Sequence, residues 1–238
     1  MALPTIQPSD FTGFVNISAD SYSTTDFQLM IARGIKKHLR ELLGDSAYID
    51  IDANTRTYWT ALFDGATYTD SSGNQVLSDS LTDILKRLIY ADWVNEGAIS
   101  TTSVGEVMNL NENAVGPTGN MQGAKAAKRV ADAAELWQST CSFIEEFRSV
   151  SEEIASVDNT DPLNPVCTVS SASGKYLENG ATVTILGVDY SAANVTATTF
   201  SVAVATSGLG SSFLNQDATW KPFDLVQDYL PEIRTGFF

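Results

Sequence analysis

Cysteine, long hydrophobic runs and basic residues are all scarce in this 238-residue chain, and each scarcity argues against a class of protein. The two cysteines, Cys141 and Cys167, are too few for a disulfide framework. Neither has a histidine or a second cysteine at metal-ligand spacing. We therefore expect two reduced thiols packed as small hydrophobic side chains, and no metal site. A pairing between the two stays open, because the sequence does not give the distance between them.

Long hydrophobic runs are also missing. No uninterrupted apolar stretch is long enough to cross a bilayer, and no basic segment followed by an apolar one begins the chain. We therefore expect a soluble chain without a signal peptide. Its hydrophobic content of 43% and charged content of 18% are typical of a globular protein, and its length allows one large domain or two.

Positive charge is the third deficit. Fourteen Lys and Arg face 29 Asp and Glu, which leaves a formal net charge of −15. A protein that binds nucleic acid needs a basic footprint to displace counterions, so specific DNA binding is not expected. The small basic groups at 33–40, 86–87 and 125–129 have helical spacing. They are interpreted as solvated helix faces, with docking on an acidic partner as the alternative.

Catalytic motifs are absent as well: the chain contains no GxSxG, HExxH, GxGxxG or CxxC. The adjacent carboxylates of Glu145 and Glu146 fall on a predicted helix, where neighbours point about 100° apart. The only histidine, His38, lies on or beside an apolar stripe and is expected to be a hydrogen-bonded core residue. We therefore expect no catalytic residue, no cofactor and no enzyme activity. An acid/base pair assembled from distant segments is the alternative.

The first 157 residues are typical of a helical domain. A capping box at Thr25 opens a helix that Gly44 closes, with apolar residues at three- and four-residue steps between them. The further elements that we expect are a short helix from Asn54 to Gly65, a hairpin around 71–74, a helix beginning near Ser78 with a broad apolar face, an extended loop over 97–119, and a long helix over 120–157.

The composition changes at "VDNTDPLNPVC", which predicts a linker over 158–165. Residues 166–209 are rich in Val, Thr, Ala and Gly and nearly free of charge. Their alternation, with Asn179-Gly180 as a hairpin turn, predicts a small antiparallel β-domain of about four strands. The fold class is therefore α+β: a helical bundle with a β-hairpin, a small antiparallel β-domain, and an aromatic-rich C-terminal tail.

The tail, residues 210–238, concentrates apolar surface near the end of the chain. So much apolar surface either returns to the chain's own bundle or docks on a neighbouring molecule. Large aromatic side chains dominate interface energies. The predicted candidates for intersubunit contacts are Trp220, Phe223, Tyr229 and Phe238.

The order of segments over about residues 10–155 resembles that of head–tail connector (adaptor, or ring) proteins of tailed bacteriophages, of the type seen in Bacteroidetes and crAss-like phages. The features that carry the resemblance are the Leu42-Leu43-Gly44 helix end, the Trp59 helix with Gly65, the turn at Gly73, the Ile89-Tyr90 helix, the loop at 101–107 and the long helix that follows. The β-domain and the tail lie outside it.

The resemblance implies a structural virion protein, located at the head–tail junction and in the host cytoplasm during assembly. Such proteins form a ring, usually dodecameric, beneath the portal protein; the ring extends the DNA channel and docks tail or neck proteins. Genome DNA would pass through without specific binding, as an acidic wall favours. No membrane partner is expected. The alternatives are a capsid decoration or head-fibre protein and, from a third class, a hydrolase of cell-surface polymers.

Overall fold

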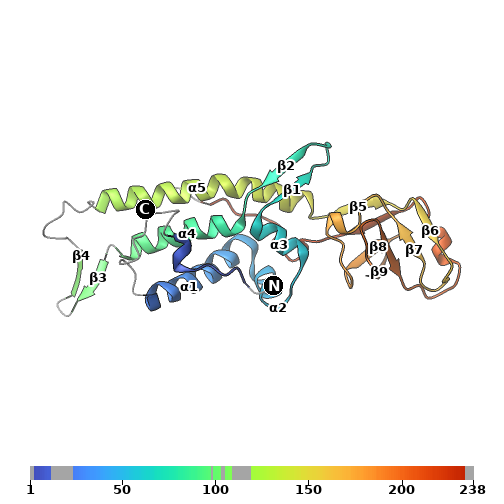
Figure 1. Ribbon diagram of the computed structural model, residues 1–238, viewed down its shortest axis with the longest axis horizontal. Helices are drawn as coiled ribbons and strands as arrows, with labels where there is room; N and C mark the ends of the chain where they lie inside the picture. Colours follow the sequence, from blue (N-terminus) through green and yellow to red (C-terminus); the bar gives the residue numbers. More distant parts are fainter. Residues whose placement is uncertain (1–2, 12–23, 98, 103–104, 109–118, 234–238) are drawn as a thin grey trace. The chain divides into compact units, whose positions relative to one another are not determined.

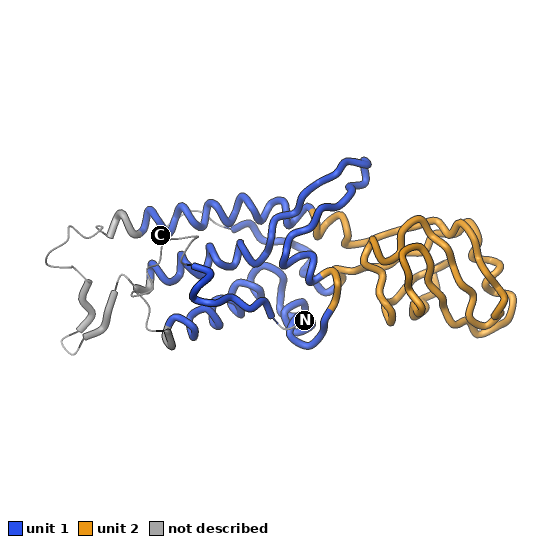
Figure 2. The backbone as a smooth tube through the Cα atoms, viewed as in Figure 1, with its two compact units in different colours: residues 1–55, 59–142, 225–238 blue, residues 56–58, 143–224 orange. Residues whose placement is uncertain are grey.

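The computed structural model describes residues 3–11, 24–97, 99–102, 105–108 and 119–233 (Figure 1). The chain forms two compact units, which are coloured separately in Figure 2. The helical unit contains residues 1–55, 59–142 and 225–238, and the β unit contains residues 56–58 and 143–224. Helices come first and most of the sheet follows, so the predicted α+β class is confirmed.

Three long helices dominate the helical unit: α1 (Thr24–Leu43), α4 (Leu81–Gly97) and α5 (Gly119–Glu146), whose last turn belongs to the β unit. The predicted apolar stripe of α1 is buried from Phe27 to Leu43. Helices α1 and α4 approach closely at Gly34, where an added Cβ would lie 2.6 Å from Cγ1 of Ile89. The ring of Phe27 packs edge-on against Trp93 of α4, with centroids 5.6 Å apart.

The end of α1 was predicted correctly. Gly44 follows Leu43 with φ of 93°, a left-handed conformation that a side chain would strain. The sequence pattern missed the next helix, α2 (Asp45–Ala53), because its isoleucines alternate with aspartates and do not follow helical spacing. Asn54 is consequently the C-cap of α2, and the following helix α3 (Thr57–Asp64) begins three residues later than expected.

Strands β1 (Ala66–Thr69) and β2 (Gln75–Ser78) form the predicted hairpin, with Thr69 opposite Gln75. The Asp70 carboxylate accepts hydrogen bonds from the backbone N–H groups of Ser72 and Asn74, which fixes the turn. Helix α4 begins two residues later than predicted: Ser80, not Ser78, caps it by accepting a hydrogen bond from the Asp83 N–H at 3.3 Å.

The predicted extended loop over 97–119 contains a second hairpin, which corrects that expectation. Strands β3 (Ile99–Thr102) and β4 (Gly105–Met108) pair antiparallel, with Thr102 opposite Gly105. Each strand has only four residues, and this segment lacks the alternation of a half-buried strand. Residues 109–118 lie outside the described part of the chain.

Helix α5 ends at Glu146, eleven residues before the predicted end at Val157. Two strands begin before Val157, β5 (Val150–Glu153) and β6 (Ser156–Asp158). Buried and exposed residues alternate along β5, and its partner strand lies more than 60 residues further along the chain. The local sequence therefore could not distinguish this strand from a continued helix.

The β unit contains one curled antiparallel sheet with the order β5-β11-β8-β9-β10-β7-β6. Its two end strands, β5 and β6, are joined only by Ile154 and Ala155. The Ile154 N–H donates to the Gln216 carbonyl before β11, and the Ala155 N–H donates to Thr168 of β7. One bent segment thus pairs with both ends of the sheet and leaves little free edge. The remaining strands are β7 (Val166–Thr168), β8 (Thr182–Ile185), β9 (Val188–Ala193), β10 (Thr199–Val202) and β11 (Asp217–Trp220).

This sheet differs from the predicted domain of about four strands over 166–209. It takes β5 and β6 from before the expected linker and β11 from the expected tail. Residues 159–165 connect the paired strands β6 and β7 instead of separating two domains. The tight hairpin turn is Leu186-Gly187 between β8 and β9, not Asn179-Gly180, which precedes β8.

Candidate functional site

The four aromatic residues predicted as intersubunit contacts have three different outcomes. Trp220 and Phe223 are buried within the β unit and are therefore core residues, which corrects their assignment as anchors. Tyr229 is 75% exposed and stays a candidate. Phe238 lies outside the described residues.

The burial of Trp220 and Phe223 has specific partners. The Trp220 indole N–H donates a 2.9 Å hydrogen bond to the Lys175 carbonyl. The Phe223 ring lies 5.1 Å from Tyr58 and 5.7 Å from Phe143, both edge-on. The tail was expected either to return to the chain's own core or to dock on a neighbouring molecule. Trp220 and Phe223 return to the chain's own core.

The segment 225–233 lies on the helical unit and caps the end of α1. Gln227 donates from its backbone N–H to the Leu43 carbonyl at 3.0 Å. Its side-chain amide donates to the carbonyls of Glu41 and Leu42, at 3.1 and 2.8 Å. A helix leaves its last four carbonyls without intrahelical donors. Gln227 alone donates hydrogen bonds to three of these carbonyls. Further along, the Pro231 carbonyl accepts a 2.8 Å hydrogen bond from the Trp137 indole.

His38 is buried, as predicted, but it has carboxylate partners that the sequence pattern did not identify. Its Nε2 lies 2.9 Å from Oδ2 of Asp92 on α4, and its Nδ1 lies 3.2 Å from Oε2 of Glu41. Both ring nitrogens face carboxylates, so only the imidazolium form donates to both. Glu41, three residues after His38 on the same helix, was the available sequence signal; Asp92 had none.

Asp92 is the centre of this charge network, because Lys37 also reaches it at 3.0 Å. Burial by itself would raise the pKa of the Asp92 carboxyl. The hydrogen bonds and charges of His38 and Lys37 outweigh burial and hold the pKa below its ordinary value. Asp92 therefore stays ionised and ties α1 to α4.

A cavity of about 280 Å³ opens beside this network. Its charged lining residues come from α1, α4 and the C-terminal segment, and its apolar lining residues come from these three segments and from α5. The lining residues are Lys37, His38, Glu41, Leu42, Leu88, Ala91, Asp92, Val130, Pro231, Glu232 and Ile233. This set holds no Ser, Thr, Cys or Tyr, so the His38–Asp92 pair has no hydroxyl or thiol within the lining to activate.

The β unit has its own charge pair, in which the carboxylate is buried and the ammonium is partly exposed. Glu152 on β5 accepts hydrogen bonds from the Lys175 ammonium and the Ser170 hydroxyl. Burial opposes ionisation, but these two donors prevail and lower the pKa of the Glu152 carboxyl. The pair attaches the segment 170–175 to the sheet, which is a structural task.

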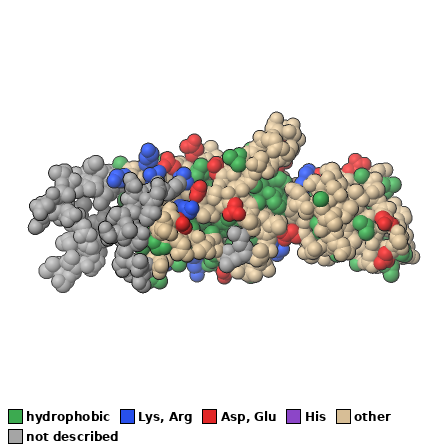
Figure 3. All heavy atoms as spheres, viewed as in Figure 1, with side chains coloured by type: hydrophobic (Ala, Val, Ile, Leu, Met, Phe, Trp, Pro, Cys, Tyr) green, Lys and Arg blue, Asp and Glu red, His purple; other side chains and the backbone are tan. Residues whose placement is uncertain are grey.

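Each of the three basic groups noted in the sequence has at least one residue in an ion pair on the helical unit. The pairs are Lys37–Asp92, Arg40–Asp45, Lys86–Asp83 and Arg129–Asp132. On the face seen in Figure 3, blue Lys and Arg atoms of this unit accordingly lie beside red Asp and Glu atoms. These basic groups thus have acidic neighbours of their own.

Within the described ranges, no group of three or more His, Cys, Asp or Glu residues is arranged to hold a metal ion. Cys141 and Cys167 are not joined in a disulfide, and burial raises the pKa of Cys167 to about 11. The helices of the described residues include none with the length and apolar character of a membrane span.

No protein-family model, curated protein or solved structure matches this chain.

Proposed function

We propose that this chain is a structural protein of a tailed-phage virion that forms a head-to-tail connector ring below the portal. The observation that carries the proposal is the order of elements in the helical unit, because the resemblance rests on the same order. Helix α1 ends before Gly44, the Trp59 helix ends before Gly65, and the Gly73 hairpin, α4, a further hairpin and the long α5 follow.

Exposed apolar side chains of the helical unit support a role in assembly. Ile49 on α2, Leu77 on β2 and Tyr229 in the C-terminal segment are each more than 60% exposed. Leu77 lies on the hairpin β1–β2, which extends beyond the helices of its own unit (Figure 1). In a ring, every subunit offers the same patch to its neighbour, so a modest contact is repeated around the circle.

The acidic balance supports a channel that DNA traverses without binding. A net charge of −15 repels phosphate, and the basic side chains named above are paired with carboxylates. The partners in this proposal are other copies of the chain, the portal protein, and tail or neck proteins. The proposed ring of copies is a dodecamer.

A capsid decoration or head-fibre role is the second candidate. The observation that favours it is the β unit, a compact sheet of seven strands, six of which lie beyond the residues that carry the resemblance. A decoration protein would bind the capsid shell and would not need a ring at the portal vertex.

The deciding experiment mixes the purified full-length chain with the portal protein of the phage that encodes it, and separately with empty capsid shells. Light scattering and negative-stain images should reveal a ring that binds the portal. A chain that binds shells and stays monomeric beside the portal would contradict the connector and favour the decoration role.

Two variants refine this experiment. Tyr229→Ala should weaken ring formation, whereas Leu163→Ala in the β unit should not. Deleting residues 220–238 would be uninformative, because Trp220, Phe223 and Val226 belong to the folded core. Removing only residues 234–238 tests the last apolar residues with the described core intact.

A further inference from the structure

The sheet of the β unit brings three connections to one end. Val166 of β7 pairs with Ser201 near the end of β10, and Ile185 at the end of β8 pairs with Ala218 near the start of β11. Because the neighbours are antiparallel, the β6–β7, β8–β9 and β10–β11 connections all leave from this same end. We name it the leucine end; it consists of residues 158–166, 186–189 and 203–217.

Exposed large apolar side chains of the β unit occur only at the leucine end. They are between 38% and 54% exposed and comprise Leu163, Leu186, Val188, Leu209 and Leu214. At the opposite end, the connections 169–181 and 194–198 carry no large apolar side chain with comparable exposure. Single exposed leucines are ordinary on a protein surface, but five large apolar residues confined to one end form a patch.

Among the five exposed residues of the patch, Leu186 is the one whose side chain the fold disfavours most. Leu186 and Gly187 form the two-residue turn between β8 and β9, with φ of 52° and 75°. Such turns favour Asn, Asp or Gly at both positions, because a larger side chain strains a left-handed backbone. The turn nevertheless carries a leucine that is 54% exposed. Strained residues of this kind cluster at sites of function.

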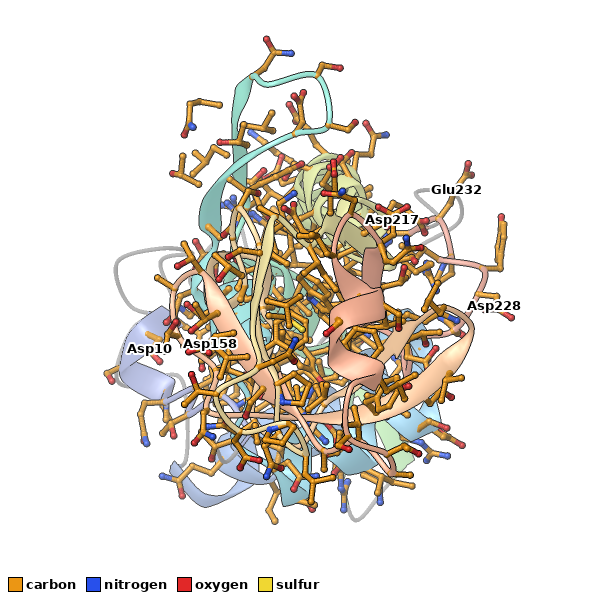
Figure 4. All side chains as sticks on the ribbon, turned by 90° about the vertical axis from the view of Figure 1, so that its right-hand side faces the viewer. Asp10, Asp158, Asp217, Asp228 and Glu232 are labelled. Atoms are coloured by element: carbon orange, nitrogen blue, oxygen red, sulfur yellow. The ribbon has the colours of Figure 1, made fainter. Side chains whose placement is uncertain are left out.

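The charge around this patch has one sign. From Ser149 to Trp220 the only basic residue is Lys175, which is paired with Glu152. The exposed carboxylates of the leucine end are Asp158, Asp161, Asp189 and Asp217. Over the right-hand end of the β unit, Figure 3 shows green and red side chains with no blue among them, and Figure 4 places Asp158 and Asp217 well apart on this unit.

Two of these carboxylates are held ionised by their own turns. Hydrogen bonds from Thr160 lower the pKa of Asp158, and hydrogen bonds from Asn164 and Leu163 lower that of Asp161. Negative charge beside leucines disfavours phosphate ligands, both nucleic acids and anionic lipids. It also disfavours contact between two copies through the same end.

We propose that the leucine end is a docking surface for a different protein, through a segment that presents apolar side chains flanked by Lys or Arg. Leu186 at the turn and Leu214 before β11 enter apolar contacts, and the surrounding aspartates pair with the basic flanks. This surface is independent of ring formation, because all of its residues belong to the β unit.

The test measures binding of a fluorescent amphipathic Lys–Leu peptide to the full-length chain by anisotropy at physiological salt. The Leu186→Ser/Leu214→Ser variant should bind about tenfold more weakly or worse, since two leucines lose apolar contact. The control Leu29→Ser, a leucine of the helical unit that is 53% exposed, should stay within about twofold of the original chain. Asp189→Asn/Asp217→Asn should weaken binding and flatten its salt dependence.

Three further measurements complete the test. A matched Glu–Leu peptide and phosphatidylserine vesicles should not bind. Light scattering should show the same degree of self-association for the leucine variant as for the original chain. Unchanged peptide affinity in the leucine variant would overturn the proposal. Equal binding of the Glu–Leu peptide, or binding of the vesicles through the leucines, would also overturn it. Loss of self-association in the leucine variant would overturn it too, because it would assign the surface to a second copy of the chain.

Discussion

The indole N–H of Trp59 donates a 2.7 Å hydrogen bond to Oδ2 of Asp50, and both side chains are buried. The other carboxylate oxygen of Asp50 accepts from the Asn54 amide at 2.8 Å. A carboxylate on α2 thereby holds the core tryptophan of α3 in one position. Hydrogen bonds to charged groups are stronger than neutral ones, and a buried carboxylate that loses a donor is costly.

Replacing Trp59 with Phe should lower the free energy of unfolding by about 2–4 kcal/mol, since the carboxylate loses a donor and the smaller ring leaves a gap. Urea unfolding followed by circular dichroism measures the change. Ile49→Ala is the control, because Ile49 is exposed on the same helix as Asp50 and should cost less than about 0.5 kcal/mol. Equal effects of the two substitutions would contradict the assigned role of the hydrogen bond.

Replacing Gln227 with Ala should loosen the end of α1, because two carbonyls lose their side-chain donor while the backbone bond to Leu43 remains. We expect a loss of about 1 kcal/mol in global stability. Hydrogen exchange should become faster over 40–44 and 225–233 and stay unchanged in β8 and β9. If exchange over these two segments does not change, the segment 225–233 is held by other contacts.

The stability of the β unit should depend on pH through Glu152. Its pKa is lowered on folding, so its stabilising contribution is present above the unfolded pKa and is lost as the pH falls through the folded value. Glu152→Gln should therefore be less stable than the original chain at pH 7, and the difference should shrink below about pH 4. A difference that persists at pH 3 would argue against the ion pair.

The two thiols should react at different rates with a thiol reagent. Cys167 is buried and its pKa is raised to about 11, so little thiolate forms in the folded state. Cys141 is partly exposed and should react first. In the folded chain we expect one rapidly labelled cysteine, identified by peptide mass, and labelling of Cys167 only on addition of urea. Simultaneous labelling of both would mean that the β unit opens readily.

Local patterns were sufficient wherever a residue's neighbours along the chain determine its conformation. The three- and four-residue spacing of α1, its end at Gly44 and the Gly73 hairpin follow from helix periodicity and turn chemistry alone. The same reasoning identified His38 as a packed residue. Residue counts determine the net charge, and residue order shows that GxSxG, HExxH, GxGxxG and CxxC are absent.

Tertiary structure decided what depends on contacts between distant segments. Val150–Glu153 is a strand because Asp217–Trp220 supplies its hydrogen bonds, a pairing that no window of neighbouring residues contains. The same pairing makes Trp220 a core residue, whereas the composition of the tail alone was equally compatible with docking on a neighbouring molecule. Asp92 meets His38 only because α1 and α4 cross at Gly34. Periodicity determines which face of an element is apolar, but only the packed chain determines what covers that face.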